Sequence, residues 1–452
     1  MLNGDIAKTI KSMTIPMIVG MIMLMTFSIV DTFFVSMLGT EQLAAISFTF
    51  PVTFTVISLN IGLGIGTSAI IGKYIGSGDT IHAKTIATGA LMLSALLVGI
   101  LAVFGVFSIE FIFSLMGADE TLMPFIKAYM VPWYLAGIFL AIPMVGNSVL
   151  RAFGDTKTPS IIMAAGGAIN AVLDPILIFG WGPIPALGIQ GAAIATAIAW
   201  AVCVVWILYL LAVKRQLIES RLLSLQEFIV ASKGVLKIGL PAAGANMLTP
   251  IAGGVMTAVV ATYGAEAVAA WGVGNRLESM ASIIVLALSM SLPPFISQNY
   301  GANKLARIKT AFDMAAKFVM LWQLMVFVIL VIFSGYIAQV FAEEASVKRD
   351  ITLFLCIVPL GYGLQGIIIL VNSSFNAMHK PMSALALSIL RLFVFYVPIA
   401  SLGSYLYGLI GLFWGCVIAN VVTSVLAYIW FNRNLKNEMA LQIVSPVLGS
   451  EK

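Results

Sequence analysis

Four side chains that carry oxygen stand within apolar stretches of the sequence, where polar groups are uncommon. Asp31 lies in TFSIVDTFFV, Asn170 and Asp174 lie in INAVLDPILIFG, and Thr196 lies in AAIATAIAW. Asn170 and Asp174 are four residues apart, so on a helix they share one face. Carboxylate, amide and hydroxyl oxygens suit a proton or a small hard cation such as Na⁺. The four residues together therefore predict a cation site.

The composition indicates that these stretches cross a membrane. Of 452 residues, 61% are hydrophobic and only 10% are charged, and the mean hydropathy is +1.06, whereas soluble proteins contain about 25% charged residues. Each crossing needs about 20 apolar residues, and continuous apolar runs favour helices over a barrel. The sequence predicts an all-α polytopic protein with twelve helices, at residues 13–38, 43–72, 85–114, 122–150, 159–182, 186–213, 238–263, 267–298, 306–336, 350–377, 381–403 and 408–431.

Asp31 and Asp174 would then lie at membrane depth, where an ionisable residue is costly and suggests a functional site. The N-terminal half has no deep basic residue to pair with them, so a proton or a cation is expected to neutralise them. Pro175 lacks an N–H, which leaves the carbonyl of Ala171 without its usual helical donor. A structural alternative is that Asp174 caps a helix broken at Pro175 and that the Thr196 hydroxyl bonds its own helix.

Basic residues fix the predicted orientation. If the N-terminus is cytoplasmic, most of the 24 Lys and Arg residues fall at cytoplasmic ends, and the opposite loops hold only Lys127, Lys348 and Arg349. This bias predicts a multi-pass protein of the plasma (inner) membrane with both termini in the cytoplasm. The net charge of +5 then reflects topology and anionic lipid, and nucleic acid is not an expected partner.

The sequence offers no site for catalysis. Its two His residues, His82 and His379, fall in separate loops, and no P-loop motif occurs. No grouping of Ser, His and Asp or of Cys and His lies at membrane depth. We therefore expect a protein that is not an enzyme and that has no cofactor.

The chain contains an internal repeat. At an offset of 225 residues, Pro, Gly, Glu, Lys and Asn positions coincide, among them Pro16 with Pro241, Gly39 with Gly264, Glu41 with Glu266, Lys84 with Lys309 and Asn147 with Asn372. The repeat predicts two six-helix bundles related by a pseudo-two-fold axis along the membrane normal. The predicted parts are an N-lobe at residues 1–213, a cytoplasmic linker helix at 214–235 and a C-lobe at 236–452.

The C-lobe differs from the N-lobe in its charges. It holds Arg276, Glu278, Asp313, Lys317 and Arg391 within or near its spans, so acids and bases can pair there. Asp313 and Lys317 are four residues apart in the favourable helical order, which predicts a structural ion pair.

The first helix has features of a moving, ligand-contacting element. Pro16 interrupts helical hydrogen bonding, and with Gly20 it predicts a point of bending, although a proline near a helix start is an equally simple interpretation. Met-rich and aromatic surfaces suit varied hydrophobic ligands, and Met21, Phe27 and Asn147 are candidates to line a substrate cavity. Packing or lipid contact is the alternative for the Met and Phe side chains.

Several motifs resemble those of the multidrug and toxic compound extrusion (MATE) transporters. These are GTSAIIGKYIGSGD with its later echo SQNYGAN, the loop RAFGDTKTP, and N-x-x-x-D-P at residues 170–175. The set of Asp31, Asn170, Asp174 and Thr196 resembles the coupling-cation cluster of the DinF-like branch. The sequence departs from the NorM-like branch, because helix seven has no acid and helix ten offers Gln365 and Asn372.

The resemblance implies a secondary active multidrug exporter. H⁺ or Na⁺ would enter at the acid cluster while a hydrophobic, often cationic organic compound leaves by alternating access, and Pro16 would bend helix one on protonation. A monomer is expected. Three alternatives remain: a lipid-linked oligosaccharide flippase of the same superfamily shape, an ion channel, and an intramembrane enzyme, which the absence of a nucleophile or metal grouping disfavours.

Overall fold

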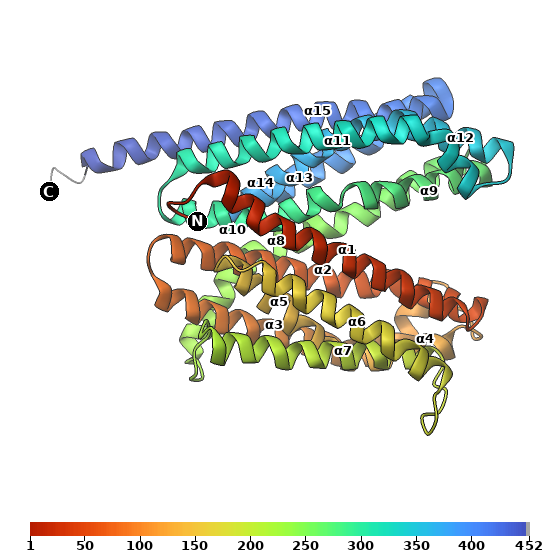
Figure 1. Cartoon of the computed structure of the whole chain (residues 1–452), viewed down its shortest axis with the longest axis horizontal. Coiled ribbons are helices and arrows are strands. Elements are labelled where there is room, and N and C mark those ends of the chain that lie inside the picture. The colour runs from red at the N-terminus through yellow and green to blue at the C-terminus, as the bar shows by residue number, and fades with distance from the viewer. Residues whose placement is uncertain (449–452) are drawn as a thin grey trace. The chain divides into compact units, whose positions relative to one another are not determined.

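The computed structural model describes residues 1–448, and it is helical nearly throughout. Ten of its helices are long and apolar enough to cross a membrane, and the bent pair α4 and α5 makes eleven. The last of the ten candidates joins two helices across a kink at Tyr407 and Gly408, and dividing it there gives twelve. The predicted all-helical fold is confirmed (Figure 1).

The first half of the chain contains eight helices. They are α1 (Ile6–Ser36), α2 (Thr40–Gly76), α3 (Thr80–Leu115), α4 (Met123–Leu135), α5 (Gly137–Ala152), α6 (Lys157–Phe179), α7 (Ile189–Tyr209) and the π-helix η1 (Leu210–Lys214).

The remaining elements begin with α8, which continues from the first half into the second. They are α8 (Leu225–Ala261), α9 (Ala265–Ala281), α10 (Ile283–Gly301), α11 (Leu305–Phe341), α12 (Ala345–Ile357), the 3₁₀-helix η2 (Val358–Gly361), α13 (Tyr362–Ala377), α14 (Pro381–Ile389), the π-helix η3 (Leu390–Tyr396) and α15 (Val397–Leu448).

The repeat in the sequence is also a repeat of backbone conformation. Gly39 and Gly264 precede α2 and α9 with φ of 126° and 100°, a region that glycine adopts without a steric penalty. At an offset of 220 residues, Gly188 before α7 and Gly408 within α15 have similar φ values, 56° and 64°. The two halves therefore use the same turns at matching positions.

The chain divides into two compact units, residues 12–243 and residues 1–11 with 244–452. This division differs from the predicted lobes in two places: residues 214–243 belong to the first unit, and the first eleven residues pack with the second unit. Lys304 donates from Nζ to the carbonyl of Leu2 at 3.1 Å, and Arg307 donates from Nη2 to the carbonyls of Met1 and Gly4 at 3.1 and 2.7 Å. Two basic side chains thus hold the start of the chain.

The linker helix predicted at 214–235 is wrong in its first part. Residues 215–224 are not helical, and α8 begins at Leu225. Glu227 explains the start of α8, since its side chain accepts from the Ser224 N–H at 2.8 Å and pairs with Arg221 at 2.6 Å. The Ser224 hydroxyl in turn accepts from the Glu227 N–H at 3.2 Å, which makes a capping box.

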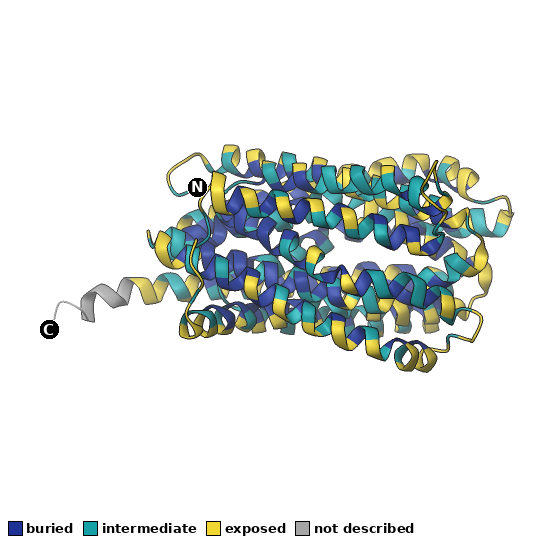
Figure 2. Ribbon diagram, turned by 90° about the horizontal axis from the view of Figure 1, so that it is seen from below, coloured by how far each residue is buried: buried dark blue, intermediate teal, exposed yellow. Residues whose placement is uncertain are grey.

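Small residues allow close helix packing in the unit at residues 12–243. A Cβ at Gly62 would collide with the carbonyl of Gly239, and one at Gly66 with that of Val235, both on α8. The small residues of GLGIGTSAIIG therefore let α2 and α8 pack closely. The buried residues lie toward the helix interfaces, and the exposed ones lie on the outer faces (Figure 2).

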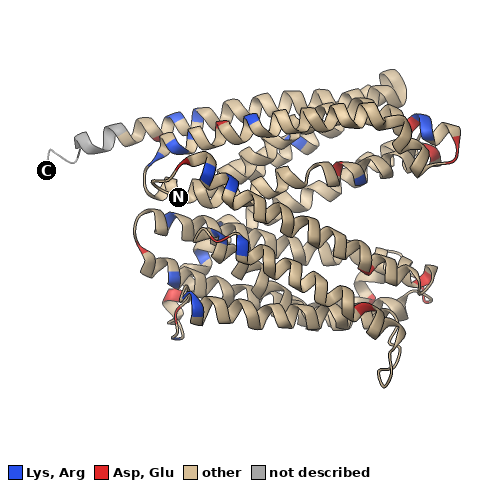
Figure 3. Cartoon of the chain, in the orientation of Figure 1, with Lys and Arg blue, Asp and Glu red and all other residues tan. Residues whose placement is uncertain are grey.

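Charged residues lie mainly near the ends of the helices (Figure 3). The predicted pairing of Asp313 with Lys317 is wrong: Asp313 instead pairs with Lys309 at 2.6 Å. The Tyr428 hydroxyl of α15 donates to Asp313 at 3.2 Å, and Lys309 lies over the Tyr428 ring at 5.2 Å. The neighbouring helix therefore selects which of the two lysines Asp313 binds.

Candidate functional site

Helices α1 and α6 run side by side in the same direction, which sets the register of the acidic residues. Gly20 faces Ser160, where an added Cβ would lie 2.9 Å from the serine Cβ. One to two turns further along, the Phe27 ring lies against Gly167. The Phe34 and Phe179 rings meet edge to face at 6.3 Å. Between these last two contacts, Asp31 of α1 comes beside Asp174 of α6.

Helix α7 closes the site from the other side of α6. Gly166 leaves room for the Cys203 thiol, because an added Cβ would lie 2.9 Å from its sulfur. Gly191 similarly packs against the carbonyl of Leu177. These close approaches bring Thr196 of α7 next to Asn170 of α6.

The four predicted residues form one cluster. Asn170 donates from Nδ2 to Asp174 Oδ1 at 3.3 Å and to the Thr196 hydroxyl at 3.1 Å. The Thr196 hydroxyl donates to the carbonyl of Ala192 at 3.0 Å, so the backbone bond expected in the structural alternative is also present. Asp174 has no exposed surface, and Asp31 is half-buried.

The carboxyl groups of Asp31 and Asp174 contact each other directly. A hydrogen bond between two carboxyl groups requires a proton on one of them, since both are acceptors when ionised. Within residues 1–448, no Lys, Arg or His forms an ion pair with either group. The cluster therefore has acceptors and a place for a positive charge, but no fixed base.

Energetics favour neutralisation of this cluster. A charged side chain at the centre of a spanning helix costs roughly 3 kcal/mol on insertion scales, and two adjacent carboxylates add mutual repulsion. A proton or a bound cation removes much of this cost. The arrangement can thus exist in a loaded and an unloaded state that differ in charge.

Sequence reasoning missed Tyr129, which lies within electrostatic range of both carboxyl groups. It belongs to α4, a helix that carries no other feature pointing to the site. Nothing in the sequence around Tyr129 distinguishes it from an ordinary aromatic residue of a membrane helix.

Asp119 lies outside the membrane spans, and nearby hydrogen-bond donors stabilise its carboxylate. Asp119, in the turn between α3 and α4, accepts from the Thr121 hydroxyl at 2.7 Å and from the Leu122 N–H at 2.9 Å. These bonds, with that of the Thr121 hydroxyl foremost, hold the pKa of Asp119 below its usual value. Local donors stabilise this carboxylate, whereas the deep pair lacks comparable donors.

Comparison with known proteins identifies the family. The MatE family model matches residues 16–176 and 241–402, which is one match in each repeat. The chain belongs to the MATE family. It is a MATE-type secondary transporter and a multi-pass membrane protein, and it is not an enzyme.

Several MATE relatives cover almost the whole chain. A protein of Shewanella oneidensis named "FAD transporter" is 41% identical over 428 residues, 95% of each chain. The "Multidrug export protein MepA" of Staphylococcus saprophyticus is 25% identical and covers 94% of this chain and 93% of its own. The crystal structure of the Vibrio cholerae MATE transporter VcmN in the bent form is 35% identical, with a TM-score of 0.91 over 96% of this chain and 98% of that chain.

In this MATE chain, Pro16 and Gly20 lie on a helix that continues from Ile6 to Ser36. Gly20 is buried against Ser160, so its small size serves the contact between α1 and α6. Bending at Pro16 stays a prediction.

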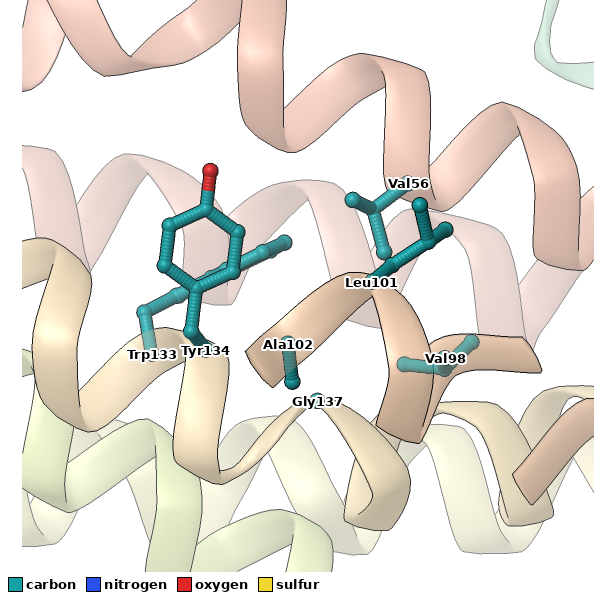
Figure 4. Close-up of a pocket in the computed structure, with 7 residues that line it drawn as sticks. All are labelled: Val56, Val98, Leu101, Ala102, Trp133, Tyr134 and Gly137. Carbon is teal, nitrogen blue, oxygen red and sulfur yellow. The ribbon is translucent and has the colours of Figure 1, made fainter. Parts of the chain in front are cut away.

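The structure places the three predicted cavity residues in different surroundings, and their role in a cavity stays a prediction. Phe27 packs against Gly167, Met21 is half-buried, and Asn147 is 6% exposed, with an Oδ1 that no described group donates to. Figure 4 shows an apolar pocket near the break between α4 and α5 that none of the three lines. It has essentially no space for even a water-sized molecule, so it is not a ligand site of the usual kind.

In the second unit, the polar residues of the predicted helix ten are engaged with neighbours. Gln365 donates to Glu278 Oε1 at 2.9 Å, and Asn372 donates to the Ser388 hydroxyl at 2.8 Å. No acid pair equivalent to Asp31 and Asp174 is formed by these residues. The two units of this MATE protein are therefore chemically different despite their shared backbone repeat.

Proposed function

We propose that this transporter exchanges H⁺ for an organic compound, and that the proton binds at the cluster of Asp31, Asn170, Asp174 and Thr196. The observation that carries the proposal is the direct contact between the two carboxyl groups with no basic partner among the described side chains. This arrangement follows the pattern of the DinF-like branch.

Two features favour H⁺ over Na⁺ as the coupling ion. Two neighbouring carboxyl groups can share a proton, because a protonated carboxyl group donates to an ionised one. In addition, the Asn170 amide presents Nδ2 to both Asp174 and Thr196, whereas Na⁺ would need an oxygen there. A Na⁺ site at the same four residues requires the amide to turn over.

The proposed cycle depends on the charge of the cluster. With both carboxyl groups unprotonated, the unit holds a negative charge that favours one conformation and its bound cargo. Protonation removes that charge and favours release. Coupling follows only if the proton and the cargo bind the two conformations with different affinities.

Bending of α1 at Pro16 is the proposed mechanical step. Pro16 cannot donate a helical hydrogen bond, and Gly20 is the next point of close contact with α6. A similar chain solved in a form named as bent supports this role.

The relatives suggest two classes of cargo. We propose a flavin dinucleotide as the first candidate, because the relative at 41% identity is named as an FAD transporter. Hydrophobic organic cations are the second candidate, because relatives at 25% identity are named as multidrug export proteins. Both classes join flat aromatic rings to a charged group.

The test uses purified protein in liposomes. Uptake of FAD and of ethidium is followed with an acidic lumen and no Na⁺, and then with a Na⁺ gradient and equal pH. We expect the pH gradient alone to drive uptake of the cargo. Asp31→Asn and Asp174→Asn should reduce uptake to the level of protein-free liposomes, and Pro16→Ala should slow it while the protein still inserts.

Glu120→Gln serves as the control, because Glu120 is an exposed acid in the loop between α3 and α4. It should transport like the wild type. Full pH-driven uptake by Asp31→Asn would refute the proposed role of the cluster. Uptake driven by Na⁺ alone would refute H⁺ as the coupling ion.

A further inference from the structure

One basic side chain lies deep in the second unit without a matched partner. Arg391 belongs to η3 and lies ten residues after the start of α14 at Pro381, so it stands near mid-membrane. Its side chain is half-buried, and its Nε is buried with no hydrogen-bond partner among the described residues. A buried donor left unpaired in this way costs free energy unless a ligand or partner satisfies it.

The backbone around Arg391 is also unusual. Residues Leu390–Tyr396 form a seven-residue π-helix, a conformation that is rare and frequently marks functional sites. This π-helical segment carries both Arg391 and Tyr396. The helix around Arg391 thus has a π-helical conformation, which is less stable than an α-helix.

One acid lies near the arginine. Glu278 of α9 lies within electrostatic range of Arg391 and of Tyr362, yet the pair forms no ion pair within 4 Å in residues 1–448. Glu278 instead accepts from Gln365. The buried Tyr362 hydroxyl has no hydrogen-bond partner in the described part of the chain.

We propose that Arg391 binds the phosphate group of the transported compound. The inference rests on the proposed flavin dinucleotide cargo. A guanidinium presents a planar fork of donors that matches two phosphate oxygens.

In this proposal, Glu278 competes with the phosphate for Arg391. Without cargo, its charge offsets that of Arg391 across a distance too long for a direct ion pair. A phosphate competes with Glu278 for the guanidinium, so the acid weakens cargo binding and favours release. Arg391 and Glu278 should therefore affect phosphate binding in opposite directions, which a merely structural ion pair would not produce.

The experiment measures binding of three flavins to the full-length protein in detergent by quenching of flavin fluorescence. FAD, FMN and riboflavin share the ring but differ in phosphate. We expect the wild type to bind FAD more tightly than riboflavin. Arg391→Gln should weaken FAD binding by at least about tenfold and leave riboflavin binding unchanged, while Glu278→Gln should strengthen FAD binding.

Two further variants keep the result interpretable. Arg276→Gln removes an exposed arginine from α9 and should not alter FAD binding. Arg391→Lys retains the charge without the fork and should give an intermediate affinity even if Arg391→Gln is too unstable to purify. Riboflavin binding reports whether each variant is folded.

The outcomes separate the two proposals. If the wild type binds FAD no better than riboflavin, the flavin dinucleotide cargo is refuted, and the phosphate site with it. If the wild type prefers FAD but Arg391→Gln and Arg391→Lys keep that preference, the role of Arg391 alone is refuted. Weaker FAD binding in Glu278→Gln would also overturn the assignment, because it indicates a structural pair.

Discussion

At the scale of residues, Asn170 connects the parts of the acid cluster. Its amide donates to Asp174 at 3.3 Å and to Thr196 at 3.1 Å, so it fixes the carboxyl group of Asp174 relative to α7. Hydrogen bonds to charged groups contribute about 1.5–3 kcal/mol. This is enough to decide whether Asp174 keeps the orientation in which it meets Asp31.

We predict that Asn170→Ala reduces pH-driven uptake by about tenfold, because Asp174 loses its amide donor. Thr196→Val, which keeps the shape but removes the acceptor for Asn170, should cause a smaller loss. Thr196→Ser retains the hydroxyl and should transport like the wild type. The measurement is initial uptake rate in liposomes, and equal rates in all three variants would argue against the network.

At the scale of elements, the contact between α1 and α6 determines whether the site exists. Asp31 and Asp174 are 143 residues apart in the sequence, and they meet because Gly20 and Gly167 let the two helices approach closely. In a membrane, where helices gain little from the hydrophobic effect, such small residues largely set how near two backbones come.

We predict that Gly20→Ala destabilises the protein by about 1–3 kcal/mol, since the new methyl group meets Ser160 Cβ and Cα. The shift of α1 should also separate the two acids and weaken pH-driven uptake. Thermal unfolding in detergent and the uptake assay measure the two effects.

Gly335→Ala is the matched control, because an added Cβ there meets nothing within 4 Å and alanine favours a helix. It should leave thermal stability unchanged or raise it slightly. An equal loss of stability in both variants would show that helix packing at Gly20 is not the cause.

At the scale of the whole molecule, the two units repeat a backbone but not its charges. Asp155 in the first unit pairs with Arg215 at 2.9 Å, and Lys380 at the matching position of the second unit pairs with Glu438 at 2.7 Å. In each pair one partner lies in a turn and the other lies later in the chain, after η1 in the first pair and within α15 in the second, with the signs reversed. The fold therefore constrains where such an ion pair forms more than which of its two positions is acidic and which is basic.

The distribution of basic residues predicts the orientation of the whole chain. A cysteine at position 120, introduced as Glu120→Cys, should react from outside the cell with a membrane-impermeant maleimide. Ser77→Cys, at the opposite end of α3, should react only after the membrane is opened. The native protein, whose cysteines are buried or half-buried, provides the background, and the reverse labelling pattern would contradict the orientation.

The sequence was sufficient to predict the membrane class, the helical repeat and the residues of the acid cluster. Composition, continuous apolar runs and the 225-residue offset are properties of short segments or of their spacing, so they can be read without coordinates. The cluster was predictable because a carboxylate is costly in an apolar helix, wherever that helix packs.

Tertiary structure decided which groups meet. It brought Asp31 to Asp174, placed Tyr129 near both, paired Asp313 with Lys309 in place of Lys317, and packed the first eleven residues with the second unit. Each of these outcomes depends on which face of a helix meets a partner that is distant in sequence. That choice is made by close packing of small residues and by donors from other helices, which the local sequence does not specify.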